Sequence, residues 1–291
     1  MKINYRFKIG ATILRFLLGF FLFKDFIIFT TNKKYLFNSS GIVSYETYQD
    51  IINYYNLHLF NINFNYELNI SIFLFLGIIF SFLFLLGFLQ QISALIIFIL
   101  LFIFKIRNIY LLDGADNVIS VILPFYFFIN TYSFSKKYDQ IIDGLLNRFK
   151  LSKFARIISF YGAIGIMIQI SIIYFFAGLH KLDGETWRNG TALYYILNSN
   201  DFSPSLLNSY ISRSLVLIKF LSWFTIFFQL SFPILIWFKK FKKIYIILGI
   251  FLHLGIFILM KIDNFSFVLI SCYAIFFNNK FYRRFRKYGM R

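Results

Sequence analysis

The chain carries a series of long apolar runs separated by clusters of basic residues. Two shorter runs, at residues 118–129 and 265–277, predict spans that rely on tilt, flanking residues or protein contacts. Six others meet or approach the roughly 20 residues that a helix needs to cross a bilayer, and they lie at residues 9–30, 70–89, 92–112, 157–178, 215–237 and 244–260. The sequence therefore predicts an all-α fold: a polytopic integral membrane helix bundle with about eight transmembrane helices.

The composition excludes an ordinary soluble domain. Of the 291 residues, 59% are hydrophobic and only 14% are charged, whereas roughly a quarter of the residues of a soluble domain are charged. The single cysteine, Cys272, lies in the last apolar run, which predicts a buried inert thiol and excludes an intramolecular disulfide. We expect residues 1–291 to form one transmembrane domain.

The positions of the basic residues predict the topology. The net charge of +18 would suggest nucleic acid as a partner of a soluble chain. Here the cations lie between or beyond the apolar runs, which is typical of cytoplasmic anchors beside a lipid bilayer, so we expect no nucleic-acid partner. Eight spans bring every cluster and both termini to the cytoplasmic side, whereas seven spans do not. The basic clusters are residues 1–8, 136–156, 239–243 and 280–291.

Two long loops, at residues 31–69 and 179–214, are expected on the extracytoplasmic side. The first contains a pattern typical of a short amphipathic helix around residues 47–55. The cytoplasmic connection at residues 138–148 has the spacing of a second amphipathic helix, one that would lie at the membrane interface.

The strongest candidate for chemistry is the polar end of the apolar run at 157–178. His180, Lys181 and Asp183 follow one another there. Ionisable residues at the edge of a span cost free energy unless they are paired, hydrated or used. This segment is therefore the first candidate for a functional site.

Lys181 has two interpretations. Desolvation and nearby cations favour the neutral amine of a lysine at such a boundary, which makes it a usable base. The alternative is a lysine that extends to the membrane surface, with Trp187 and the pair Tyr194 and Tyr195 forming an interfacial aromatic belt.

Three further polar residues lie inside apolar runs. Arg15 and Asp25 share the first run, either in a structural ion pair, or as charges that extend to the membrane interface, or as part of a polar cavity with Arg15 near its inner end. His253 lies in the middle of its run, either hydrogen-bonded to a neighbouring helix or binding the oxygen of a quinone or substrate.

A polar cluster follows the third run. Lys105 and Arg107 are close in sequence to Asp113, Asp116 and Asn117, and these charges either neutralise one another or contribute to a site. No metal site is predicted, because the chain has three histidines, one cysteine and no HxxxH or HExxH spacing.

The polar segment reads Tyr-Phe-Phe-Ala-Gly-Leu-His-Lys-Leu-Asp at 174–183, followed by Trp187, Gly190 and Ala192. It resembles the corresponding segment of the HTTM (horizontally transferred transmembrane) family, which includes the membrane part of vitamin K-dependent gamma-carboxylase, and it is the specific part of that resemblance. Supporting segments occur in order: Arg-Phe-Leu-Leu-Gly at 15–19 with Asp25, Asp-Gly-Ala-Asp-Asn at 113–117, Asp-Gly-Leu-Leu-Asn at 143–147, Phe-Ser-Pro at 202–204 and the run around His253.

The resemblance implies a carboxylase-like chemistry in which Lys181 is the base that takes a proton from a quinol. The quinol would be of the vitamin K or menaquinol type, and His253 matches a supporting histidine of the family. His180 and Asp183 are the secondary catalytic candidates. Arg15, Asp116, Asn117 and Trp187 are the candidates for binding the cofactor.

This sequence departs from the carboxylase at two positions. His180 stands where the carboxylase has a second lysine, and the segment at Asp116 and Asn117 lacks a histidine. The chain is more similar to short bacterial members of the kind of sporulation-delaying protein B. We therefore expect a protein of the bacterial cytoplasmic membrane that modifies or matures an exported peptide or protein at the extracytoplasmic face, together with partner maturation proteins. The alternative is a noncatalytic membrane assembly or transport subunit.

Overall fold

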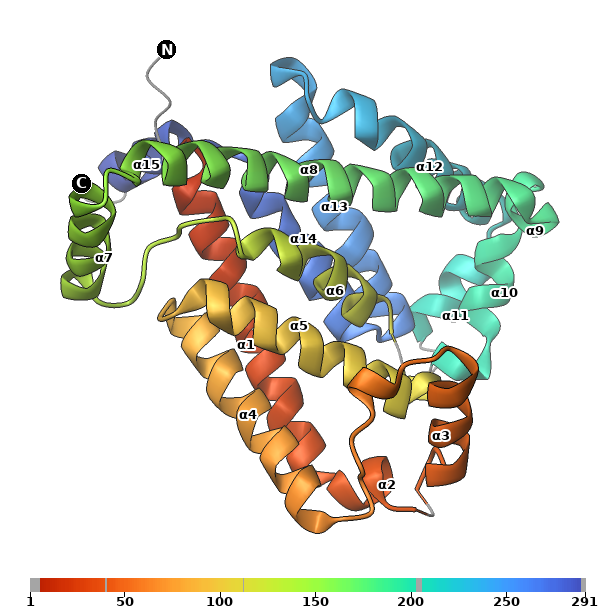
Figure 1. Ribbon diagram of the computed structural model, residues 1–291. Helices are drawn as coiled ribbons and strands as arrows, with labels where there is room; N and C mark the ends of the chain where they lie inside the picture. Colours follow the sequence, from red (N-terminus) through yellow and green to blue (C-terminus); the bar gives the residue numbers. More distant parts are fainter. Residues whose placement is uncertain (1–5, 40, 112, 203–205, 289–291) are drawn as a thin grey trace. The chain divides into compact units, whose positions relative to one another are not determined.

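The computed structural model describes residues 6–39, 41–111, 113–202 and 206–288, and all regular secondary structure in these ranges is helical (Figure 1). The all-α prediction is confirmed. The elements are α1 (Lys8–Thr31), α2 (Lys33–Phe37), α3 (Tyr45–Tyr54), η1 (His58–Phe60), α4 (Glu67–Leu86), α5 (Gln90–Arg107), η2 (Ile109–Leu111), α6 (Gly114–Tyr126), α7 (Lys136–Arg148), α8 (Ser152–Asp183), α9 (Glu185–Arg188), α10 (Ala192–Asn198), η3 (Asn200–Phe202), α11 (Leu206–Ser212), α12 (Leu215–Leu235), α13 (Lys239–Met260), α14 (Asp263–Cys272), η4 (Tyr273–Phe276) and α15 (Asn279–Tyr288).

Each of the eight predicted apolar runs is mostly helical in the described residues, whereas residues 87–89 and 127–129 lie outside the helices and residue 112 lies outside the described ranges. Five helices, α4, α5, α8, α12 and α13, are long and apolar enough to cross a membrane. Helix α1 has 24 residues, but Arg15, Lys24 and Asp25 interrupt its apolar surface. Helices α6 and α14 have 13 and 10 residues, which is short for a span. The count of eight spans and the cytoplasmic termini therefore stay predictions.

The structure refines the predicted loops. Helix α8 has 32 residues and continues to Asp183, so the segment expected to begin a loop at residue 179 is the last turn of a helix. The loop proper begins at residue 184 and contains α9, α10, η3 and α11. The helices predicted at 47–55 and 138–148 are confirmed as α3 and α7.

The chain forms two compact units. The first unit comprises Met1–Gly165 and Ala274–Arg291, and the second comprises Ile166–Tyr273. In the first unit α1 lies alongside α4, and α5 packs against α4 and α6 (Figure 1). The aromatic rings of Phe37 and Phe64 have centroids 5.0 Å apart, and the Phe73 centroid lies 5.7 Å from that of Phe37, so the loop at residues 31–69 contributes to this core.

The second unit is built on α12 and α13. Helix α12 packs against α10 and α13, and α13 packs against α14. The centroids of Tyr174 from α8 and Phe232 from α12 are 4.3 Å apart, and Tyr245 from α13 stacks on Phe228 at 5.6 Å. Aromatic rings from three helices thus form the centre of this unit.

The first unit contains an irregular segment, residues 127–133, that continues from the short helix α6. Backbone groups without partners are costly in a membrane, because lipid offers no hydrogen bonds. Side chains of the surrounding helices supply these bonds. Three main-chain amides donate to them: Asn130 N to Ser159 Oγ at 2.9 Å, Tyr132 N to Thr12 Oγ1 at 3.0 Å and Thr131 N to Gln90 Oε1 at 3.3 Å. Two main-chain oxygens accept from them: Tyr132 O from Arg15 Nη2 at 3.1 Å, and Ile129 O from the Gln90 side chain.

Candidate functional site

Lys181 lies half-buried in the last turn of α8, in the second unit. Its Nζ is 5.1 Å from the centroid of the Trp187 ring and 3.5 Å from the carbonyl oxygen of Ala177. Among the described residues no carboxylate lies within 4.0 Å of it. The amine therefore has an aromatic face and a carbonyl as neighbours, and no countercharge.

One face of α8 carries Lys181 together with Tyr174 and Gly178. Residues at spacings of four and seven share a helix face, and Tyr174 is about 10 Å from Lys181 along the axis at a rise of about 1.5 Å per residue. A Cβ atom on Gly178 would be 2.8 Å from Leu230 Cδ2 and 3.3 Å from Gln229 Cβ. The small residue lets α12 pack closely on this face.

A buried hydrogen-bonded network lies on the same face. The Tyr174 hydroxyl is 2.7 Å from His253 Nε2 on α13 and 2.5 Å from the Tyr273 hydroxyl. A Cβ atom at Gly249 would overlap the Tyr273 hydroxyl, so the glycine one turn before His253 makes room for this ring. The structure thus shows His253 as a buried histidine bonded to a neighbouring helix.

Two buried polar atoms of the second unit have no hydrogen-bond partner within the described part of the chain. They are Nδ1 of His253 and Oε1 of Gln229. Buried polar groups are nearly always hydrogen-bonded, so each such exception needs an explanation. The role of Gln229 was missed at the level of sequence, although a lone amide in the apolar run at 215–237 is a signal of the same kind as His253.

His180 and Asp183 are exposed on the last turn of α8. No hydrogen bond joins either side chain to Lys181 in the described ranges. The main-chain oxygen of Asp183 accepts from Arg188 Nη1 at 3.2 Å, and the Arg188 carbonyl accepts from Trp223 Nε1 at 3.1 Å. Of the predicted residues in this segment, the structure brings together Lys181 and Trp187.

Arg15 is buried in the first unit, where its donors bind main-chain and hydroxyl oxygens. Its Nε donates to Thr131 Oγ1 at 2.9 Å and its Nη1 to Leu85 O at 2.7 Å. Among the described residues Arg15 does not pair with Asp25, whose carboxylate lies 3.2 Å from Lys24 Nζ. Arg15 instead satisfies the carbonyls at the end of α4, which supports a structural role.

Asp116 and Asn117 lie in the first turn of α6. Asp113 caps this helix: its Oδ1 accepts from Asp116 N at 3.0 Å, and Asp116 Oδ2 accepts from Asp113 N at 3.3 Å. Burial and repulsion by Asp113 raise the pKa of Asp116, which precedes the apolar part of α6. Lys105 Nζ donates to Asn117 Oδ1 at 3.0 Å.

Arg107 does not take part in this cluster. Its guanidinium is fully buried and donates to the main-chain oxygens of Val43 at 2.6 Å and of Phe37 and Asn38 at 3.0 Å each. Of the two interpretations of this cluster, neutralisation by the carboxylates does not hold for Arg107 among the described residues, because three carbonyls of the loop at residues 31–69 bind its charge instead. Arg107 anchors that loop to α5.

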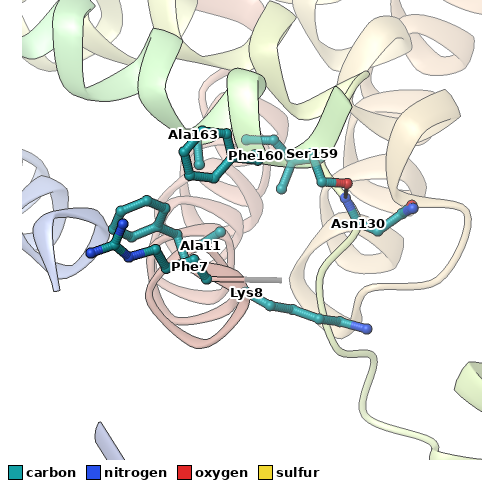
Figure 2. A pocket seen from close by; sticks show the side chains of 9 residues that line it. Phe7, Lys8, Ala11, Asn130, Ser159, Phe160 and Ala163 are labelled. Atoms are coloured by element: carbon teal, nitrogen blue, oxygen red, sulfur yellow. Dashed lines mark hydrogen bonds between the residues drawn. The ribbon is translucent and has the colours of Figure 1, made fainter. Parts of the chain in front are cut away.

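Two small pockets of the first unit are not lined by the predicted site residues themselves, although Arg15 donates to Thr131, which lines the second pocket. One is lined by Phe7, Lys8 and Phe160 among others, and Figure 2 shows the Lys8 side chain extending away from the two rings. The other is lined by polar groups that include Gln91 and Asp143. Neither contains a predicted site residue, so the quinol site stays a prediction.

The predicted site residues fall into two groups, one in each unit. His180, Lys181, Asp183, Trp187 and His253 belong to the second unit. The other group, in the first unit, is Arg15, Asp116 and Asn117.

Comparison with known proteins gives a family match and two relatives. A family model described as the HTTM domain matches residues 10–281. The uncharacterized protein YitO of Bacillus subtilis (strain 168) is 24% identical over 168 residues, which is 56% of this chain and 52% of that protein. Sporulation-delaying protein SdpB of the same organism is 23% identical over 177 residues, 57% of this chain and 51% of that protein. The matched region thus spans about half the length of these relatives, and no solved structure matches the chain significantly.

Proposed function

This chain belongs to the HTTM domain family, and from that premise we propose that it modifies or matures an exported peptide or protein at the extracytoplasmic face of a bacterial cytoplasmic membrane, with Lys181 as the base. The family match and the similarity to sporulation-delaying protein SdpB support a membrane protein of that kind. Partner maturation proteins would act with it.

The environment of Lys181 carries this proposal. A lysine that only anchors a helix gains most when its ammonium reaches water or lipid phosphate. Lys181 is half-buried and lies instead over the ring of Trp187, and no carboxylate of the described chain compensates its charge. Such surroundings favour the neutral amine, which is the form that accepts a proton.

Two polar atoms of the second unit support the proposal of a quinol of the vitamin K or menaquinol type as the cofactor. Nδ1 of His253 and Oε1 of Gln229 are buried and have no hydrogen-bond partner in the described part of the chain. Such groups in apolar surroundings are what would hydrogen-bond the oxygen atoms of a quinol ring. When bound, a quinol supplies an acidic hydroxyl group and two electrons. Lys181 would accept the hydroxyl proton, and Trp187 would cover the amine.

The second candidate function is a noncatalytic assembly or transport subunit. Arg15 and Arg107 favour it, because the hydrogen bonds of both guanidiniums hold main-chain oxygens of the fold. In such a subunit the other polar residues would also only stabilise the bundle.

The variant Lys181→Arg separates the two functions. Arginine keeps the charge and the contact with Trp187 but stays protonated, so a base would be lost. We expect maturation of the cognate exported substrate to fall by about 100-fold to 10,000-fold, the range for loss of a general base. Lys219→Arg is the matched control in the same unit. Full activity of Lys181→Arg at normal membrane abundance would exclude the catalytic role.

The proposed orientation has its own test. In a Cys272→Ser background, we expect a membrane-impermeant maleimide to label Ser199→Cys in intact cells and Ser152→Cys only after permeabilisation. The reverse pattern would place Lys181 on the cytoplasmic side and exclude extracytoplasmic chemistry.

Cofactor binding is tested directly with menaquinol-4, which quenches tryptophan fluorescence when it binds close to Trp187. Loss of one good hydrogen bond to the ligand should weaken binding by about tenfold in Gln229→Leu. Ser222→Ala on the same helix is the control. Equal binding by both variants would remove Gln229 from the site.

A further inference from the structure

Helix α7 has an uncovered apolar face. None of its residues is buried in the first unit, to which it belongs. Ile141, Leu145 and Phe149 are 52%, 45% and 66% exposed, and they follow one another at spacings of four residues, which places them on one side of the helix. The exposed residues Leu151 and Phe154 continue the apolar surface into the start of α8.

The first turn of α7 is fixed to the rest of the first unit. The Tyr138 hydroxyl accepts from Leu89 N at 3.1 Å, and Asp139 Oδ1 accepts from Ser133 N at 2.9 Å. Ser135 caps the helix through a bond from Tyr138 N at 3.3 Å. The helix is therefore held by its polar N-terminal turn, while the described residues of this unit leave its apolar face exposed.

Cations border the apolar face. Lys137 lies four residues before Ile141 and Arg148 three residues after Leu145, so both lie along one edge of the face. Lys136, Lys150 and Lys153 add positive charge before and after it. An apolar face beside a row of cations matches the layered chemistry of an anionic membrane surface.

The position of α7 in the chain selects the bilayer among candidate partners. Helix α8, which is long and apolar enough to cross a membrane, begins four residues after Arg148. The C-terminal end of α7 is thus tied closely to a segment that enters the lipid. A flat membrane surface is therefore within reach of the apolar face without any change in the first unit.

We propose that α7 and the turn after it, residues 136–154, form a binding surface for anionic phospholipid. Ile141, Leu145 and Phe149 enter the boundary between headgroups and acyl chains. Lys137 and Arg148 contact the phosphates of acidic headgroups.

The test uses the full-length protein reconstituted in vesicles of phosphatidylcholine alone or of equal parts of phosphatidylcholine and phosphatidylglycerol. A nitroxide is attached at Leu145→Cys in a Cys272→Ser background, and the matched label is at Asn147→Cys, on the polar side of α7. Accessibility to oxygen reports lipid and accessibility to a nickel chelate reports water. With phosphatidylglycerol present we expect the Leu145 label to be accessible to oxygen and shielded from nickel, and the Asn147 label to be accessible to nickel.

The charges are tested by the double variant Lys137→Gln, Arg148→Gln. Loss of two cations near an anionic surface should lower the ratio of immersed to exposed Leu145 label by roughly 30-fold in the phosphatidylglycerol vesicles. The control Lys34→Gln, Arg213→Gln removes two exposed cations elsewhere and should leave the ratio unchanged.

Two outcomes would overturn the proposal. Nickel accessibility at Leu145 in both kinds of vesicle would mean that the face is exposed to water. Protection from both reagents that does not depend on phosphatidylglycerol would mean that a protein, such as a second copy of this chain, covers the face.

Discussion

Replacing Tyr174 by phenylalanine removes one hydroxyl group at the centre of the second unit. That hydroxyl is bonded to both His253 Nε2 and the Tyr273 hydroxyl. The phenyl ring left at this position would keep the contact with Phe232, whose centroid is 4.3 Å from that of Tyr174, so no cavity forms. The variant therefore isolates the contribution of the hydrogen bonds.

The magnitude follows from the number of bonds lost. Side-chain hydrogen bonds between helices of membrane proteins contribute about 0.6 kcal/mol on average and at most about 1.7 kcal/mol. Two bonds then give about 1.2 kcal/mol, with an upper limit of about 3.4 kcal/mol. We expect the upper half of this range, because His253 Nδ1 is already unpartnered and the variant leaves Nε2 of the same ring without its Tyr174 partner.

The free energy of unfolding is measured in bicelles by titration with sodium dodecyl sulfate. Tyr245→Phe is the matched control, since the Tyr245 hydroxyl makes one bond, to Ser231 Oγ at 2.8 Å. The double variant with Tyr273→Phe should lose less than the sum of the two single losses, because both remove the same bond. Equal losses for Tyr174→Phe and Tyr245→Phe, with additive behaviour of the double variant, would refute the network.

Three further predictions concern single positions. Gly249→Ala should cost about 1–3 kcal/mol in unfolding free energy, because its Cβ overlaps the Tyr273 hydroxyl; Gly255→Ala on the same helix, which meets nothing within 4 Å, should cost nothing. Arg107→Met should speed amide hydrogen exchange around residues 41–48 by about 100-fold, because three loop carbonyls lose their donor. Unchanged exchange, or an equal effect of Lys105→Met, would contradict the anchoring role of Arg107. The raised pKa of Asp116 means that the folded state binds a proton more tightly than the unfolded state. Stability therefore falls as pH rises from the ordinary pKa of 3.8 through the raised pKa. Asp116→Asn should remove this pH dependence from the free energy of unfolding measured across that window, and a dependence that persists would assign it to another group.

The helices could be predicted from the sequence because their signal is local. Apolar length predicted each run, and alternating apolar and polar spacing predicted α3 and α7. The end of α8 was placed too early, at Gly178, because His180, Lys181 and Asp183 look like the start of a loop. A helix continues through polar residues at a membrane surface, since its backbone bonds do not depend on apolar side chains.

The partners of the polar side chains could not be predicted in the same way. Tyr174 and Tyr273 are 99 residues apart, and nothing in the sequence pairs them. For Arg107, nearness in sequence suggested Asp113, whereas its partner Val43 is 64 residues away. Arg107 binds carbonyls because a folded loop presents several oxygens at once, which is a property of the assembled structure.

The irregular segment after α6 has a consequence for how this protein enters the membrane during synthesis. Its backbone bonds are supplied by Thr12 and Gln90, which are made earlier, and by Ser159, which is made later. If the insertion machinery released this segment alone into lipid, its amides would have no hydrogen-bond partners. We expect α6 to wait beside α1 and α5 until the first turns of α8 have emerged from the ribosome, so that these helices leave the translocon as a group.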